Sequence, residues 1–281
     1  MSDLRALFEQ RDSGAEQRHG GEGVFVATDW SGGPWDPNAA HGGAPAALLA
    51  RAIEHHDPEL PGFVARLTVE LLRPVPLHVP LEVSSATVRP GRKVALVEAS
   101  ITSEGTPVAT ARALLIRRAD LPVPDTAHTD DVLAMSPSEA APVELRISDH
   151  EAPDGDSVWS GYGQANDSRV VAGTFETEGP GTAWFRLTVP VLVDEPLTPL
   201  MRVMAAADFP NGISRTLDWE KYLFINPDLT VALHRYPEGE WVALDAVSIF
   251  GNDGHGQSEA VLYDETGRIG RAVQSLFVDR Y

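Results

Sequence analysis

Two polar residues occupy positions where the sequence pattern predicts apolar packing. Asp208 ends a stripe with Leu200 and Met204 at helical spacing, so its carboxylate is expected to face a sheet. The helix dipole disfavours a carboxylate in a last helical turn by roughly 0.3 to 1 kcal/mol. Gln274 falls on the apolar face of a predicted strand, where an unsatisfied amide would cost on the order of 1 to 3 kcal/mol. A structural role does not obviously offset these costs, so both residues are candidates for catalysis.

Each candidate also has an ordinary interpretation. Asp208 could cap the turn at 210–212, and Gln274 could satisfy backbone groups or a polar neighbour. A third candidate, Asn226, lies at the entrance to a predicted strand. It precedes Pro227 and could simply form an Asx-type turn.

A pair of glycines, Gly42 and Gly43, precedes a predicted helix that carries Pro45 in its first turn. Backbone N–H groups at a helix start can stabilise the oxyanion that develops on a carbonyl under attack. The alternative is a loop that needs glycine for its backbone angles. The neighbouring His41 is interpreted as structural or solvated, as isolated histidines beside loops usually are.

The elements that hold these residues are repeated along the chain. The segment LTVELLRPVP, which starts at Leu67, aligns with LTVALHRYP, which starts at Leu229, at an offset of 229 − 67 = 162. Gly105 and Gly267 keep the same offset, 267 − 105 = 162. Two pieces in one order at one spacing predict a duplicated unit of roughly 110 to 130 residues.

The two units differ at Gln274, whose counterpart at this offset is Arg112. Such a difference is expected if one of two related sites works and the other has degenerated.

Each unit is predicted to contain one helix and several antiparallel strands. In the first unit the helix is expected over 44–56 and strands over 64–73, 81–88, 94–102 and 107–117. In the second unit the helix is expected over 198–207 and strands over 182–193, 228–235, 241–250, 258–263 and 269–278. Each sheet would wrap around its helix, and pairing the two sheets edge to edge would cover exposed strand edges. The predicted domains are 1–118, with a polar arm at 1–23, and 170–281, joined by a linker at 119–169 in which one strand is expected over 143–147.

Composition narrows the possible functions. The chain has 281 residues, no cysteine and a formal net charge of −19. The absence of cysteine excludes disulfides, a thiolate nucleophile and cysteine-based zinc sites. The negative charge makes nucleic acid or an anionic membrane an unlikely partner. No histidine or carboxylate cluster has metal spacing, no GxSxG motif is present, and the N-terminus lacks signal-peptide features. We therefore expect a soluble, cytoplasmic protein without metal or cofactor.

Several segments resemble the double-hotdog acyl-CoA thioesterases of the TesB-like type II group. The C-terminal half carries the resemblance in AAADF, INPDLTVALHR and GRAVQSLFVDR, and the first half carries it in GGAPAALLARA and VRPGRKVALVEA. The resemblance implies an α+β fold of two tandem hotdog units, each an antiparallel sheet around a central helix. It also implies hydrolysis of an acyl-CoA thioester and assembly into a homo-oligomer.

In the resembled family an Asp, a Thr and a Gln together hold the attacking water. Asp208 and Gln274 match two of these positions, whereas the Thr position is occupied by Asn226. An amide in place of a hydroxyl changes the geometry with which water can be held.

A turn of an expected hairpin contains the densest basic cluster of the chain. Arg89, Arg92 and Lys93 could meet the phosphates of coenzyme A, which would require a local positive patch in an acidic protein. The alternative is a solvated turn.

Two other functions are compatible with the same fold. One is a non-catalytic binder of acyl ligands, suggested by Asn226. The other is a hydratase acting on enoyl thioesters, which would need an Asp and a His at one site; no histidine is placed there by the sequence pattern. Fold alone does not decide among these functions.

Overall fold

The computed structural model describes residues 5–11, 21–127, 131–143, 161–173, 175 and 177–281. The first half contains β1 (Phe8–Arg11), β2 (Gly23–Ala27), η1 (Asp29–Ser31), α1 (Gly43–Glu54), β3 (Phe63–Leu71), β4 (Pro80–Arg89), β5 (Val94–Ser103), β6 (Thr106–Ile116) and η2 (Asp125–Ala127). The remainder contains β7 (Ala141–Val143), α2 (Gly161–Gln164), β8 (Asn166–Ala172), β9 (Gly181–Leu187), α3 (Pro199–Ala206), α4 (Pro210–Ile213), β10 (Tyr222–Ile225), β11 (Asp228–Leu233), β12 (Val242–Phe250), β13 (His255–Asp264) and β14 (Gly267–Arg280).

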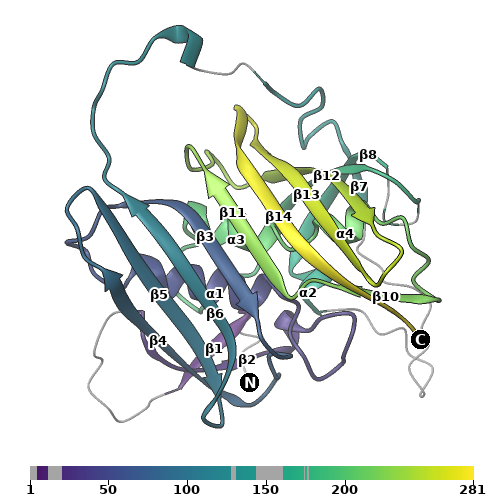
Figure 1. Cartoon of the computed structure of the whole chain (residues 1–281), viewed down its shortest axis with the longest axis horizontal. Helices are drawn as coiled ribbons and strands as arrows, with labels where there is room; N and C mark the ends of the chain where they lie inside the picture. The colour runs from purple at the N-terminus through teal and green to yellow at the C-terminus, as the bar shows by residue number, and fades with distance from the viewer. Residues whose placement is uncertain (1–4, 12–20, 128–130, 144–160, 174, 176) are drawn as a thin grey trace.

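The strands form one continuous sheet with two halves. Related strands follow one another in opposite directions outward from its centre. Its order is β1-β2-β4-β5-β6-β3-β11-β14-β13-β12-β9-β8-β7, with β10 paired separately to β14. The two halves meet at β3 and β11, which lie side by side at the centre of Figure 1. The predicted edge-to-edge pairing of two sheets is therefore confirmed.

The junction between the halves follows the repeat. Thr68 lies opposite Thr230, its own counterpart at an offset of 162, and the two hydroxyl oxygens are 3.1 Å apart. On either side, Leu67 pairs with Val231 and Val69 pairs with Leu229. The two copies of the repeated segment therefore pair with each other as antiparallel strands. This register places an approximate two-fold axis at the threonine pair.

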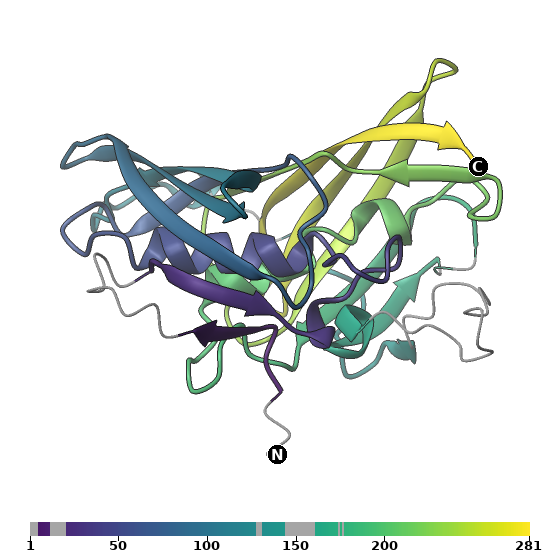
Figure 2. The same ribbon diagram turned by 90° about the horizontal axis from the view of Figure 1, so that it is seen from below.

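The central helices lie on one face of the sheet (Figure 2). Every residue of α1 from Gly43 to Ile53 is buried, as expected of a helix that is covered on all sides. Thr198 caps α3 by accepting a hydrogen bond from the amide of Met201 at 3.1 Å. Its hydroxyl also donates to Glu54 at the end of α1, 2.5 Å away.

α1 and α3 are antiparallel, because contacts link opposite ends of the two helices. The end of α1 meets the start of α3 through Thr198 and Glu54. A Cβ on Gly43, at the start of α1, would lie 2.7 Å from the carbonyl oxygen of Ala205, in the last turn of α3. The start of α1 therefore faces the residue that follows α3, which is where Asp208 lies.

Two predicted irregular regions contain ordered elements. Within the expected polar arm, β1 pairs with β2, and both Leu7 and Phe8 are buried. Within the range expected as linker, β7 pairs with β8, and α2 packs beside η1. Most of the strand predicted near Val143–Ile147 lies outside the described residues, although β7 includes Val143.

Candidate active site

Asp208 is the centre of a buried polar cluster. It lies directly after Ala207, the C-cap of α3, and its side chain is 5% exposed. Oδ1 accepts hydrogen bonds from Nδ2 of Asn226 at 2.7 Å and from Nε2 of Gln274 at 3.2 Å. A carboxyl oxygen has two lone pairs, so Oδ1 can accept both of these hydrogen bonds.

Gln274 reaches this cluster from β14, where the period of two turns its side chain toward the helices. The residue is fully buried, and its Nε2 also lies 3.4 Å from the backbone oxygen of Asp208. Within the described chain its Oε1 is buried and accepts no hydrogen bond. An unsatisfied buried carbonyl is costly, so this acceptor is available to a hydrogen-bond donor that enters the site.

Asn226 lies between β10 and β11 and uses its amide group on two acceptors. In addition to Asp208, Nδ2 contacts the backbone oxygen of Asp228 at 3.3 Å. This residue therefore fixes the carboxylate, and an Asx turn alone does not account for its contacts.

The two glycines are required by close packing rather than by backbone angles. Gly42 has an ordinary helical conformation, with φ −58° and ψ −25°. A Cβ there would lie 2.6 Å from Oδ2 of Asp208, and a Cβ on Gly43 would lie 2.5 Å from the hydroxyl of Tyr162. Real Cβ contacts are essentially never this short, so the glycines let the helix start approach the carboxylate.

His41 joins the cluster, so of its two interpretations the solvated one is wrong. Its Nδ1 is 3.0 Å from Oδ2 of Asp208, and its side chain is 12% exposed. The ring stacks on Tyr162 with centroids 4.5 Å apart at 15°, and it lies 4.9 Å from the Phe209 ring. No periodic pattern predicts this contact, because the two residues come from different halves of the chain.

Tyr162 connects the helix ends that frame the site. It is fully buried, and its hydroxyl donates to the backbone oxygen of Ala205 at 2.8 Å. Burial raises the pKa of the phenol well above its usual value, and the negative charge of Asp208 raises it further. Tyr162 therefore remains a protonated donor. It falls in α2, inside the range predicted as linker, and sequence reasoning did not identify it.

The prediction that Arg112 is the counterpart of Gln274 in the first half is wrong by one residue. Thr68 pairs with Arg112 in the first half, and Thr230, the counterpart of Thr68, pairs with Val273 in the second. Arg112 therefore corresponds to Val273, and Gln274 corresponds to the buried Ala113. A shift of one residue moves a side chain to the other face of the sheet. The first half thus has a methyl group where the second has an amide.

The basic hairpin is not brought to this cluster. Arg89, Arg92 and Lys93 lie at the β4–β5 turn, beside the Phe63 end of β3, because Val94 and Phe63 both pair with Ile116. The opposite end of β3, at Leu71, adjoins the cluster through Gly42. The nine-residue strand between these ends spans roughly 30 Å at about 3.3 Å per residue.

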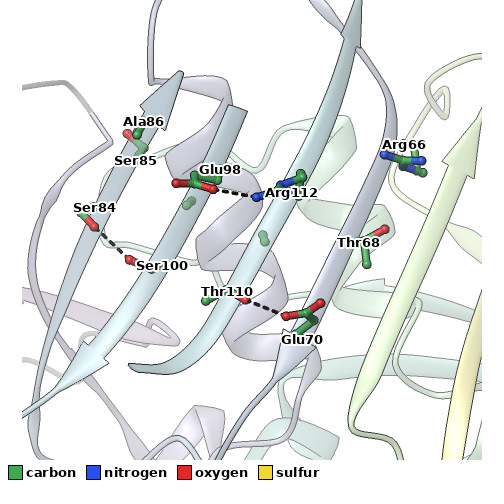
Figure 3. Close-up of a pocket in the computed structure, with 12 residues that line it drawn as sticks. Arg66, Thr68, Glu70, Ser84, Ser85, Ala86, Glu98, Ser100, Thr110 and Arg112 are labelled. Carbon is green, nitrogen blue, oxygen red and sulfur yellow. Dashed lines mark hydrogen bonds and ion pairs between the residues drawn. The ribbon is translucent and has the colours of Figure 1, made fainter. Parts of the chain in front are cut away.

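A separate polar groove lies on the outer face of the first half's sheet (Figure 3). Its volume is about 550 Å³. Its walls carry mutual contacts: Arg112 pairs with Glu98 at 3.0 Å, and Thr110 donates to Glu70 at 3.3 Å. It contains none of the buried cluster around Asp208.

The described residues lack two further kinds of feature. No group of three or more His, Asp or Glu side chains in the described segments could hold a metal ion. None of the helices within those segments is both long and apolar enough to cross a membrane.

Comparison with known families matches two segments of the chain. Residues 31–116 match an acyl-CoA thioesterase N-terminal domain, and residues 137–278 match an acyl-CoA thioesterase C-terminal domain. A search of curated proteins finds no match.

Solved structures share the fold at low sequence identity. A hot dog protein of unknown function from Alicyclobacillus acidocaldarius is 18% identical, with a TM-score of 0.70 over 96% of this chain and 97% of that one. The acyl-CoA thioesterase II TesB2 of Mycobacterium marinum is 14% identical, with a TM-score of 0.64 over 92% of both chains. The tesB protein of Mycobacterium avium subs paratuberculosis gives the same identity and TM-score over 94% and 95%. The predicted double-hotdog fold is confirmed.

Proposed function

The chain belongs to the acyl-CoA thioesterase family, and we propose on this basis that it hydrolyses an acyl-CoA thioester to the free acid and coenzyme A. Water attacks the thioester carbonyl directly, so no covalent intermediate or cofactor is needed. The convergence of Asn226, Gln274 and His41 on the carboxylate of Asp208 is the observation that carries the proposal.

The donors around Asp208 suggest how the water is held. Asn226 and Gln274 occupy Oδ1 and fix the carboxylate, which leaves Oδ2 facing the start of α1. The buried Oε1 of Gln274 accepts one hydrogen of the water. In this proposal Asp208 is the group that orients the attacking water and supports loss of its proton.

The start of α1 provides partial positive charge that could stabilise the thioester oxygen. The amides of Gly42 and Gly43 lie at the positive end of the helix dipole and adjoin Asp208. They would donate to the thioester oxygen as negative charge develops on it, the Gly43 amide by exchanging its present hydrogen bond to Nδ1 of His41 for one to the substrate. The groups that hold the attacking water and the groups that stabilise the oxyanion thus come from opposite halves of the repeat.

The experiment is release of free thiol from a panel of acyl-CoAs that differ in chain length and branching. Wild type is compared with Asp208→Ala and with a control, Asp253→Ala, which changes an exposed carboxylate in the β12–β13 turn. We expect Asp208→Ala to lose at least about 100-fold in kcat/KM and the control to retain activity. Full activity of Asp208→Ala would exclude this mechanism, and inactivity of the wild type on every substrate would exclude the function.

A non-catalytic acyl binder remains the alternative if no substrate is turned over. Asn226, which replaces the Thr of the resembled family, is the residue that favours it. Calorimetry with a non-hydrolysable acyl-CoA thioether would then detect tight binding without thiol release.

Hydration of an enoyl thioester gains support from one contact. The sequence placed no histidine beside Asp208, whereas His41 lies 3.0 Å from it in the structure. An Asp and a His together can deliver water and a proton to a carbon–carbon double bond. Loss of enoyl-CoA absorbance would reveal this activity.

We also propose that the chain self-associates through the outer face of its sheet. The groove there alternates charge, with Arg66 and Arg112 beside Glu70 and Glu98, so a second copy turned by 180° could match it (Figure 3). Sedimentation of wild type and of Arg112→Glu tests this; a wild-type monomer at all concentrations would exclude it.

A further inference from the structure

A row of polar side chains crosses the buried face of the second half's sheet. Gln274 of β14 lies directly opposite Ser258 of β13, which in turn lies opposite Ser248 of β12. All three side chains are buried. The three strands are neighbours in Figure 1, and α4, which begins two residues after Asp208, packs on β12 and β13. The row therefore starts at the candidate site and continues beneath α4.

The hydrogen bonds at the α4 end of the row have a fixed direction. The hydroxyl of Ser214 donates to the backbone oxygen of Pro210 at 2.7 Å, since a carbonyl oxygen only accepts. The hydroxyls of Ser214 and Ser248 are 2.8 Å apart. Because a hydroxyl has a single hydrogen, Ser248 is the donor in this pair. Ser248 therefore has no hydrogen left for its other neighbour, Ser258.

At the other end of the row, Ser258 and Gln274 have unused hydrogen-bonding groups. Among the described residues, neither Oγ of Ser258 nor Oε1 of Gln274 makes a hydrogen bond, and both atoms are buried. Leaving such atoms unsatisfied is costly. Oε1 only accepts, whereas the hydroxyl of Ser258 has a hydrogen to donate. A water that accepts from Ser258 and donates to Gln274 would satisfy both atoms.

The two amides of the cluster already direct their hydrogens at protein acceptors. Nδ2 of Asn226 contacts the carboxylate of Asp208 and the backbone oxygen of Asp228. Nε2 of Gln274 contacts the carboxylate and the backbone oxygen of Asp208. The hydroxyl of Ser258 is thus a donor that these amides do not supply.

The first half shows that the fold does not require polar side chains at these positions. Ala113 corresponds to Gln274, and Val97 lies opposite Ala113 as Ser258 lies opposite Gln274. Both Ala113 and Val97 are fully buried. The same two positions therefore pack as apolar residues in the half that lacks the polar cluster, and the hydroxyl of Ser258 accompanies the amide of Gln274.

We infer that Ser258 is a further residue of this site, and that its hydroxyl holds the attacking water together with Oε1 of Gln274. The inference rests on the proposed thioester hydrolysis. The water oxygen accepts the hydrogen of Ser258, and its own hydrogens are donated to Gln274 and to Oδ2 of Asp208. Since a water makes at most about four hydrogen bonds, one lone pair remains for the carbonyl carbon.

The hydroxyl of Ser258 places the water and exchanges no proton. As the water oxygen bonds to the carbonyl carbon, the carbonyl electron pair moves to its oxygen and one water proton passes to Asp208. When the oxyanion collapses, the C–S bond breaks and Asp208 gives the proton to the departing sulfur, which yields acid and thiol. Ser258 keeps its hydrogen throughout.

Ser258→Ala and Ser248→Ala form a matched pair of variants, because each removes one buried hydroxyl from neighbouring strands. Only the hydroxyl of Ser248 is hydrogen-bonded to a described protein group. We expect Ser258→Ala to lower kcat by about 10- to 100-fold with little change in KM and to leave the urea midpoint of unfolding nearly unchanged. Ser248→Ala should instead lower the midpoint and retain kcat.

The outcomes distinguish the inference from the function on which it rests. If wild type hydrolyses acyl-CoA and Ser258→Ala retains its rate, the proposed function stands and the inference is wrong. A lowered urea midpoint with normal kinetics in Ser258→Ala would assign this hydroxyl a structural role. If wild type hydrolyses no acyl-CoA, the proposed function fails and the inference fails with it.

A second measurement needs neither a variant nor a substrate. A high-resolution crystal structure of the wild-type protein is expected to show a water within hydrogen-bond distance of both Oγ of Ser258 and Oε1 of Gln274. A direct hydrogen bond between these two side chains, with no such water, would overturn the inference.

Discussion

A Cβ on residue 42 and Oδ2 of Asp208 would be only 2.6 Å apart, so the helix start and the carboxylate can adjoin only because Gly42 has no side chain. The same Cβ would lie 2.8 Å from Cδ1 of Leu71. Gly42→Ala must therefore displace the carboxylate, the leucine or the helix.

We expect Gly42→Ala to lower kcat by about 10- to 100-fold, because even small displacements of reacting groups are costly. The control is Gly62→Ala, since a Cβ at Gly62 meets nothing within 4 Å. Steady-state kinetics and thermal unfolding of both variants provide the measurement. Equal rates in the two variants would show that the close approach is irrelevant to catalysis.

Gln274→Met is expected to separate activity from stability. Methionine retains the length and fills the buried space, but it removes both the donor to Asp208 and the unsatisfied Oε1. Because loss of the two hydrogen bonds from Nε2 to Asp208, of which the one to the backbone oxygen is long at 3.4 Å, is offset by removal of one unsatisfied carbonyl, the free energy of unfolding should change by less than about 1 kcal/mol. The rate should fall at least about 100-fold. A large loss of stability with normal kinetics would assign Gln274 a structural role.

We predict that the hydroxyl of Tyr162 is one reason why residue 43 cannot carry a side chain without loss of stability. A Cβ on Gly43 meets the Tyr162 hydroxyl at 2.5 Å and the Ala205 oxygen at 2.7 Å, and Tyr162→Phe removes the first of these obstacles. Gly43→Ala should therefore destabilise the Tyr162→Phe protein less than it destabilises wild type. A double-mutant cycle from denaturant unfolding measures the coupling, which is expected to exceed 0.5 kcal/mol. Additive effects would contradict the packing argument.

Asp264 is expected to make the free energy of unfolding depend on pH in the acidic range. Burial alone would raise its pKa, but hydrogen bonds from Arg235 and from the backbone of Glu238 and Thr266 lower it from 3.8 to about 2. A depressed folded-state pKa gives stability that is complete above about pH 4 and is lost as the pH falls toward 2.

Asp264→Asn should therefore remove part of this acid dependence and lower stability at neutral pH by on the order of 2 kcal/mol. Unfolding by urea between pH 2 and 7 is the measurement. Parallel stability curves for the two proteins over that range would be inconsistent with the lowered pKa.

The basic hairpin remains a prediction with a direct test. Arg92→Glu combined with Lys93→Glu should raise KM for acyl-CoA and weaken its salt dependence if the turn meets phosphates. An unchanged KM would agree with the position of the turn at the far end of β3 from Leu71.

The sequence repeat predicted the architecture because its evidence is distributed along the chain. Alternating apolar residues defined most strands, and the offset of 162 located the pairing of Thr68 with Thr230. The short strands β1, β8 and β10 do not follow from the sequence pattern, since FEQR, NDSRVVA and YLFI show no alternation of apolar and polar residues. The counterpart of Gln274 was misplaced because the offset is 162 at β3 and β11 but 161 at β6 and β14.

The site was predictable only in part. Asp208, Asn226 and Gln274 were identified as candidates, and the structure brings them together. His41 and Tyr162 were not assigned roles, because their contacts depend on how α1 and α3 pack and leave no local pattern. The exposed position of Arg112, by contrast, follows from strand register, which a single sequence specifies only loosely.

The pairing of Thr68 with Thr230 also bears on how such a protein could arise. A single ancestral unit would expose the edge of its β3-like strand, and two copies could pair there through facing threonines as a homodimer. Two identical chains would necessarily carry two identical sites. Once both copies are in one polypeptide, one can retain the amide of Gln274 while the other accepts the methyl of Ala113, without loss of the partner that completes the sheet. The covalent link therefore permits asymmetry that a dimer of identical chains does not.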